Sequence, residues 1–273
     1  MFFKSLKGFP FVVLLALIAN PMVQAGVVLE SALTFEKVSQ SGEIYRGKLL
    51  LRNTEDTPGE AKLYQTDYEF SVNENIRYGE PGRLARSNAN WIRLSRNQVT
   101  VPGNSTEVIE FEVKVPSGQG SALNGTYWSM IMVEPIDQRS AESMSDLEDG
   151  SVQIKQVMRY AVQVVTHIGN TGSTGLSFTN PGLTTEGNEH IFAIDVENTG
   201  QRWVRPNLWL ELYNESGKPI GKFEGPGKRL YPSTSARIKV QLGDVPTGKY
   251  LGLVVADGTG DDLFGANVEL DIE

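Results

Sequence analysis

The sequence predicts an all-β protein made of two β-sandwich domains that follow a cleaved signal peptide. Three observations lead to this prediction. Apolar and polar residues alternate with a period of two along much of the chain, and turn residues recur at short intervals. A Gly/Ser/Thr/Asn cluster at 169–175 then divides the pattern into two parts. We therefore expect domains at residues 26–168 and 176–273, joined by a linker at 169–175.

Residues 1–25 have the three parts of a secretory signal. Lys4 and Lys7 give a positive start, an apolar run extends from Phe9 to Ala19, and Val23-Gln24-Ala25 forms a small-x-small cleavage site. The apolar run is shorter than the roughly 20 residues that span a bilayer. We expect cleavage before Gly26, no membrane span afterwards, and a periplasmic location, with the cell surface as the alternative.

The composition excludes several classes of function. The formal net charge is −8, and the predicted signal removes two lysines but no acidic residue. An acidic protein with scattered cations is a poor partner for nucleic acid or an anionic membrane. The chain has no cysteine, so it has no disulfide, no thiol catalysis and no thiolate metal site. Each sandwich must therefore be stabilised by its own core.

Individual strands can be predicted in both halves. In the first half, Ile109, Phe111, Val113 and Val115 alternate with charged residues, and Tyr127–Val133 is nearly continuously apolar. In the second half, short runs bounded by turns predict strands at Ile191–Glu197, Leu208–Tyr213, Pro219–Glu224, Arg237–Leu242, Tyr250–Ala256 and Ala266–Ile272.

The two halves look like diverged copies of one unit. The words Asn-Thr, x-Pro-x, Val-Pro and Gly-x-Tyr occur in the same order in each, and Pro102 to Pro116 spans the same distance as Pro232 to Pro246. The Gly-x-Tyr words place Tyr127 and Tyr250 at the starts of strands. There each hydroxyl could bond an upstream backbone group, as in the tyrosine corner of immunoglobulin-type sandwiches. We therefore expect both domains to be immunoglobulin-like.

No motif indicates an enzyme or a cofactor. The two histidines, His167 and His190, fall in different halves without a nucleophile motif nearby. Asp257, Asp261 and Asp262 surround two glycines and are weak candidates for a calcium site. Since Asp-Gly between two strands is a common hairpin signal, we favour a turn there over a metal site.

Aromatic residues offer one alternative reading. Aromatic side chains at strand spacing usually belong to a core, but they could also line a sugar-binding platform. The residues concerned are Tyr64, Tyr68, Trp91, Trp128, Trp203 and Trp209.

The most informative segment is Val152–Ile168. Seventeen extended residues would span roughly 55 Å, and strands in sandwiches are usually shorter. Either the segment bends, or its early half extends beyond its own core with an outward apolar stripe that a partner uses. The polar, acidic stretch Asp137–Gly150 before it reads as a mobile loop.

This organisation resembles the periplasmic pilus-chaperone (PapD-like) superfamily. The most specific local pieces are Leu49–Thr54, Val99–Gly103 and Val152–Val164. The resemblance implies that the last strand of the first domain is lent to an incomplete subunit fold. That family anchors the subunit with an arginine on the first strand and a lysine near the last. Here Val27–Ser31 has no arginine.

The sequence therefore predicts a non-enzymatic, periplasmic chaperone-like or assembly protein for surface or pilus subunits, which acts by β-strand addition. The partner is a protein client, and Lys155 or Arg159 could stand in for the missing cation of the family. The alternative is a structural or adhesive surface module that binds polysaccharide or another surface protein. The expected client-binding residues are Val152, Ile154, Lys155, Met158, Arg159 and Tyr160.

Overall fold

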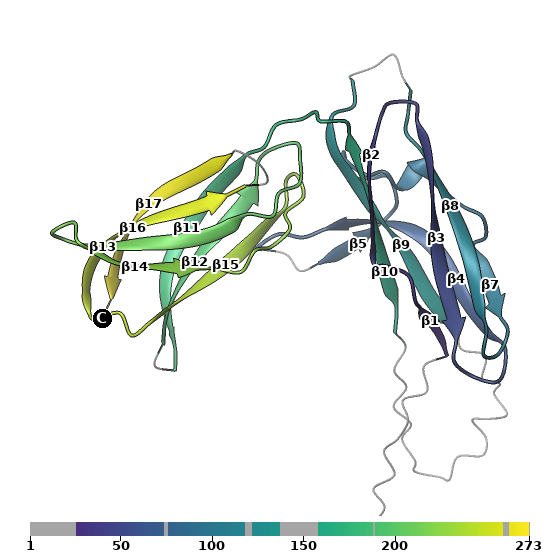
Figure 1. The fold of residues 1–273 in the computed structure, drawn as a ribbon, viewed down its shortest axis with the longest axis horizontal. Helices are drawn as coiled ribbons and strands as arrows, with labels where there is room; N and C mark the ends of the chain where they lie inside the picture. The colour runs from purple at the N-terminus through teal and green to yellow at the C-terminus, as the bar shows by residue number, and fades with distance from the viewer. Residues whose placement is uncertain are drawn as a thin grey trace, which may run out of the picture.

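The computed structural model describes residues 26–73, 76–117, 122–136, 158–187, 189–258 and 262–272. The predicted fold class is confirmed in this part of the chain, which forms four antiparallel or mixed sheets arranged as two sandwiches (Figure 1). The predicted signal at 1–25 lies outside the described residues. Within the described part, no helix has the length and apolarity needed to cross a membrane.

The first sandwich is built from a sheet in the order β1-β3-β8-β6 and a sheet in the order β2-β10-β9-β4-β5, in which β7 also pairs with β4. Its elements are β1 (Val27–Leu29), β2 (Thr34–Ser39), β3 (Ile44–Asn53), β4 (Gly59–Glu69), β5 (Arg77–Gly79), the 3-10 turn η1 (Ala89–Trp91), β6 (Ile92–Leu94), β7 (Gln98–Val101), β8 (Thr106–Lys114), β9 (Gly125–Ile136) and β10 (Tyr160–Ile168).

The second sandwich is built from a sheet in the order β11-β12-β15 and a sheet in the order β14-β13-β16-β17. Its strands are β11 (Leu176–Glu186), β12 (Glu189–Asn198), β13 (Asn207–Asn214), β14 (Pro219–Glu224), β15 (Ser235–Gly243), β16 (Gly248–Asp257) and β17 (Leu263–Ile272). The six strands predicted in this half are confirmed to within three residues at each end.

Each sandwich has its own apolar core. On β8, Ile109, Phe111 and Val113 are buried while the charged residues between them face outward, as the alternation predicted. The second core is centred on buried residues such as Phe192 and Leu210. Because both cores are filled by inward-facing strand residues, neither sandwich depends on a disulfide.

A buried asparagine stabilises the equivalent corner of each sandwich by hydrogen bonds to the backbone. Asn53 Nδ2 donates to the carbonyl oxygens of Thr57 (2.7 Å) and Val101 (3.0 Å), while its Oδ1 accepts from the N–H of Glu55 (3.0 Å). Both side-chain groups are therefore satisfied although Asn53 is fully buried.

Asn198 repeats this arrangement in the second sandwich. Its Nδ2 donates to the carbonyl oxygens of Arg202 (2.8 Å) and Leu230 (2.9 Å), and its Oδ1 accepts from the N–H of Gly200 (2.9 Å). The matching pattern of bonds supports the idea that the two halves are diverged copies.

The structure corrects the register of this repeat by one residue. Asn104 and Ser233 are the matching left-handed residues, with φ of 54° and 62°. Pro102 therefore corresponds to Tyr231, and not to Pro232 as the spacing of the prolines suggested. The carbonyl oxygens of these two residues accept from Ser105 and Thr234, at 2.8 Å in each case.

The beginning of the chain divides between two sheets. β1 pairs antiparallel with β3, and β2 then pairs parallel with β10 in the opposite sheet. The change of sheet occurs between Glu30 and Leu33. Leu33 lies at this change of sheet and is 55% exposed, although it has the same parity in the sequence as Leu29 and Phe35, which pack against the first core.

The segment predicted as a linker is held by backbone contacts. Gly169 donates its N–H to Ser39, and Ser173 accepts from the N–H of Gln201 at 2.7 Å. Gly125 has φ of +67°, and a Cβ there would lie 2.0 Å from the carbonyl oxygen of Gln201. Only glycine fits at this close approach, so the two sandwiches touch through their backbones.

An aromatic stack continues this junction. Trp128 of β9 and Tyr231 of the second sandwich stack with ring centroids 4.7 Å apart and an interplanar angle of 14°. The Tyr231 hydroxyl donates to Gln163 Oε1 at 3.0 Å, and burial raises the pKa of Tyr231. Trp128 and Val165 of the first sandwich thus belong to the same apolar cluster as the second core.

Tyr250 has the geometry of a tyrosine corner. Its ring is 7% exposed, and its hydroxyl donates to the carbonyl oxygen of Pro246 at 2.6 Å. Tyr127 differs from the prediction: its half-buried ring lies against Trp91, with centroids 4.7 Å apart, and no described residue bonds its hydroxyl. Pro116 lies eleven residues before Tyr127, so it is too far along the chain to repeat the short Pro-to-Tyr turn of the second sandwich.

We expect Tyr250→Phe to lower the free energy of unfolding by about 1 kcal/mol, because the hydrogen bond from the Tyr250 hydroxyl to Pro246 is lost. Tyr127→Phe is the matched control, and it should change stability by less than half as much. Urea denaturation followed by tryptophan fluorescence measures both. Equal effects of the two substitutions would contradict the assignment of the corner to Tyr250.

Candidate functional site: the edge of β10

β10 is the strand whose edge is incompletely covered. It pairs with β9 over its whole length, from Tyr160 opposite Val133 to Ile168 opposite Gly125. Its other edge pairs with β2 only from Gln163 onward, where Thr34 is the first partner. The early part of β10 therefore has a neighbour on one side only within the described part of the chain (Figure 1).

The backbone of Ala161 points to this open side. Gln163 donates its N–H across the edge to the carbonyl oxygen of Leu33 at 2.8 Å. Alternate residues of a strand direct their N–H and C=O groups to the same edge. Ala161 therefore directs a donor and an acceptor to the same side as Gln163, at a point that β2 does not reach. Such an unpaired edge is a template for an added strand.

The side chains of β10 change from buried to exposed toward this end. Val162 and Val164 are completely buried in the first core, and Tyr160 packs against that core while half-buried. Met158, one of the expected client-binding residues, is 57% exposed. Extending the register places it opposite Pro135, which has no N–H to continue the ladder.

Arg159 already has an acidic partner. Its guanidinium lies 2.9 Å from Glu134 of the neighbouring strand β9. The other carboxylate oxygen of Glu134 accepts from the Tyr64 hydroxyl at 3.1 Å. Burial and this contact raise the pKa of Tyr64. A client carboxylate would have to compete with Glu134 for Arg159, so the predicted role of Arg159 as an anchor requires this pair to open.

Three of the predicted site residues, Val152, Ile154 and Lys155, lie outside the described residues. The structure therefore brings together Met158, Arg159 and Tyr160, at the open end of β10. Sequence reasoning missed the part played by β2, which determines where the open edge begins. The signal that could have indicated it is the polar interruption at Glu30-Ser31, which separates two short apolar pieces.

The described part of the candidate calcium site, Asp257 and Asp262, makes contacts typical of a turn between strands. No group of three potential metal-ligating side chains occurs among the described residues. Asp257 ends β16 and pairs with Leu263, the first residue of β17, so β16 and β17 are antiparallel neighbours, as the expected turn requires. Asp262 accepts from Thr174 Oγ1 at 2.5 Å, and Asp261 lies outside the described residues.

The candidate aromatic residues do not form one platform. Trp91 packs on Tyr127, Trp128 stacks on Tyr231, and the ammonium of Lys222 lies 4.0 Å from the centroid of Trp209. Because these rings serve separate contacts in two sandwiches, the sugar-platform alternative has no single surface to support it.

Comparisons with known proteins identify similar solved structures. No family model and no curated protein matches the chain. The chain is similar to the class 5 fimbriae chaperone CfaA, with 10% identity, a TM-score of 0.49 and coverage of 89% of this chain and 98% of that one. It is also similar to the CsuC–CsuE chaperone–tip subunit complex of Acinetobacter baumannii, with 11% identity, a TM-score of 0.45 and coverage of 89% and 98%.

A third similar structure is the Salmonella enterica SafA pilin in complex with the SafB chaperone. It shares 11% identity and a TM-score of 0.40, with coverage of 89% of this chain and 97% of that chain. At these identities, the function of this protein has to be argued from its own strands and side chains.

Proposed function

We propose that this protein is a non-enzymatic, periplasmic chaperone-like protein that holds subunits of a surface or pilus assembly by β-strand addition. The observation that carries the proposal is the edge of β10, which β2 covers only from Gln163 onward. A client strand that lies along this edge would take the unused N–H and C=O of Ala161. Main-chain bonds of this kind supply affinity without depending on the client's sequence.

The fixed half of β10 gives this edge its rigidity. Val162 and Val164 are locked in the core, and all nine residues of the strand pair with β9. An edge that is held in place before binding loses less conformational entropy when the client arrives. Tyr160 and Met158 would supply register and selectivity, and we expect the same of Ile154 and Val152, which share their parity in the sequence and lie outside the described residues.

The location follows from the predicted signal. A chain exported without cysteines folds in the periplasm without disulfide chemistry. The same open edge would serve a surface module that joins a neighbouring protein, which is the alternative that we named from the sequence. The two functions differ in the partner, because a chaperone holds subunits that lack a strand and later releases them.

Met158→Glu tests the proposal on a described residue. Because Met158 is 57% exposed, the substitution should leave stability unchanged. It should weaken capture of subunits from periplasmic extract at least about tenfold, since a charge would enter the client's apolar groove unpaired. Leu251→Glu is the matched control, because Leu251 is 53% exposed on the second sandwich. Equal capture by both variants would contradict strand addition and favour the surface module.

A further inference from the structure

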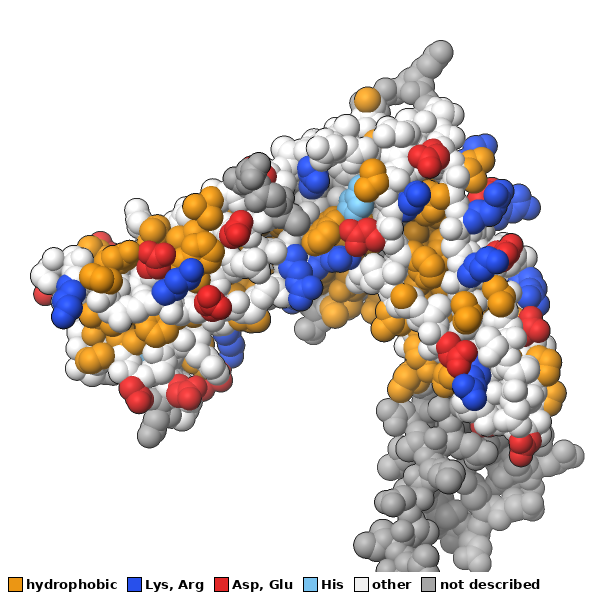
Figure 2. Space-filling view, in the orientation of Figure 1, with side chains coloured by type: hydrophobic (Ala, Val, Ile, Leu, Met, Phe, Trp, Pro, Cys, Tyr) orange, Lys and Arg blue, Asp and Glu red, His pale blue; other side chains and the backbone are white. Residues whose placement is uncertain are grey.

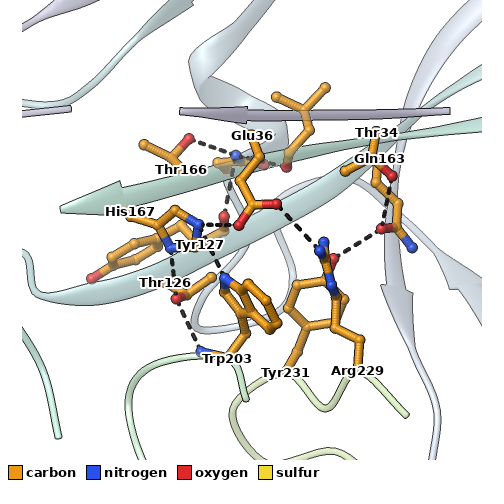
Figure 3. Close-up of polar contacts among 12 residues, drawn as sticks. Thr34, Glu36, Thr126, Tyr127, Gln163, Thr166, His167, Trp203, Arg229 and Tyr231 are labelled. Atoms are coloured by element: carbon orange, nitrogen blue, oxygen red, sulfur yellow. Dashed lines mark hydrogen bonds and ion pairs between the residues drawn. The ribbon is translucent and has the colours of Figure 1, made fainter. Parts of the chain in front are cut away.

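A histidine lies at the junction of the two sandwiches. Figure 2 shows a histidine beside acidic, basic and apolar side chains where the sandwiches meet, and Figure 3 shows the contacts of His167. Its Nδ1 lies 3.1 Å from Thr126 Oγ1. Its Nε2 lies 2.7 Å from Glu36 Oε1 and 3.1 Å from the indole nitrogen of Trp203. The sequence suggested only an ordinary strand-end residue here.

The two contacts of Nε2 require opposite protonation states. The indole N–H of Trp203 can only donate, so it needs an unprotonated Nε2 with a free lone pair. The Glu36 carboxylate can only accept, so it needs a proton on Nε2. His167 therefore cannot bond both partners at the same time. The neutral tautomer with its proton on Nδ1 can accept from Trp203, whereas the neutral tautomer with its proton on Nε2 and the charged imidazolium can only donate to Glu36.

These two partners come from different sandwiches. Glu36 lies on β2 and His167 on β10, which pair with each other in the first sandwich. Trp203 lies between β12 and β13 of the second sandwich. The bond from Trp203 to His167 therefore joins the sandwiches, whereas the bond from His167 to Glu36 stays within one of them (Figure 3).

Charged groups from both sandwiches surround His167. Arg229 of the second sandwich lies 3.3 Å from the other oxygen of Glu36, and its guanidinium is 4.1 Å from the centroid of Trp203. Arg202, on the same segment as Trp203, bonds Asn170 at 2.8 Å. Glu36 and Arg229 attract each other across the junction in either state of His167. A positive imidazolium adds a repulsion toward the Arg229 guanidinium, which weakens this attraction.

We infer that the junction between the two sandwiches responds to protonation of His167. Only the neutral form has a tautomer in which Nδ1 donates its proton to Thr126 and Nε2 accepts from Trp203, and this tautomer closes the junction. In the charged form, Nε2 donates to Glu36, Trp203 loses its acceptor, and the imidazolium repels Arg229. Acidification through the range in which histidines titrate, about pH 8 to 5, loosens the contact between the sandwiches.

Spin labels test this inference, because the chain has no cysteine of its own. Cysteines replacing Val108 and Leu251, which are exposed on different sandwiches, carry the two labels. Double electron–electron resonance then measures the distance distribution between them. In the otherwise unchanged protein, this distribution should be narrow at pH 8 and should broaden at pH 5.

Three variants identify the responsible group. His167→Asn should remove the pH response, and His190→Asn should keep it because His190 is the only other histidine. Trp203→Phe removes the indole donor, so its distribution should already be broad at pH 8, which also decides the question if His167→Asn does not fold. An unchanged distribution between pH 8 and 5 in the parent, or an equal response in His167→Asn, would overturn the inference.

Discussion

The double substitution Val152→Glu with Ile154→Glu should abolish client binding while the first sandwich stays folded. Both residues lie outside the described part of the chain, and their parity is that of Met158 and Tyr160. Since Met158 is already exposed, we expect substitutions earlier on the same parity to leave the core of the first sandwich intact. Two unpaired charges in an apolar groove cost several kcal/mol, so we expect affinity to fall by at least about 100-fold.

The matched control places the same charges on the other parity. Ser151→Glu with Gln153→Glu adds two carboxylates to the same stretch, but they should face away from the client's groove. This variant should bind within about threefold of the parent in a titration with purified client. Equal losses in both double variants would show that net charge, rather than the apolar parity, controls binding. That result would contradict the selectivity that we assign to alternate side chains.

The second large effect concerns stability. Asn53→Ala and Asn198→Ala should each lower the free energy of unfolding by about 2–4 kcal/mol. Each substitution removes the side-chain partner of one buried carbonyl oxygen, one part-buried carbonyl oxygen and one part-buried N–H. An unsatisfied buried polar group costs about 1–3 kcal/mol, and part of this cost is relieved by relaxation. Guanidinium denaturation with circular dichroism measures the change.

Asn207→Ala serves as the control for this pair, since Asn207 is exposed at the start of β13. It should change the free energy of unfolding by less than about 0.5 kcal/mol. A shift of that small size for Asn53→Ala or Asn198→Ala would show that the corner asparagines do not stabilise their sandwiches.

Local pattern made most of the second sandwich predictable. β14 was predicted with its observed bounds, Pro219–Glu224, because turn residues flank a short alternating run. β11 was missed, since Asn180 takes a left-handed conformation with φ of 49° and the register shifts between Thr179 and Gly182. A bulge of this kind interrupts the alternation that identifies a strand.

The candidate site was only partly predictable. The unusual length and alternation of Val152–Ile168 left two readings, a bent segment or a strand that extends beyond its core with an outward apolar stripe, and the described part forms β10. Where the open edge begins depends on parallel pairing between β2 and β10, which are more than a hundred residues apart in sequence. No local pattern encodes such a pairing. The ion pair between Arg159 and Glu134 is hidden from sequence for the same reason.

The contacts of His167 could not be predicted from its neighbours in the sequence. At the end of an alternating strand, a lone histidine has no distinguishing neighbour in sequence. Its partners Glu36, Thr126 and Trp203 come from three distant segments, which only the packed sandwiches bring together. The fold class could thus be predicted from periodicity. The junction between the domains could not, because it depends on contacts between residues that are far apart in the sequence.

Amide hydrogen exchange at Ala161 tests strand addition most directly. In the free protein, its N–H points to the open edge and should exchange rapidly, while the amide of Val162, directed toward β9, should exchange slowly. Binding of a purified client should slow exchange at Ala161 at least about tenfold, because a new main-chain bond must break before exchange. Unchanged exchange at Ala161 in a saturated complex would contradict strand addition along β10.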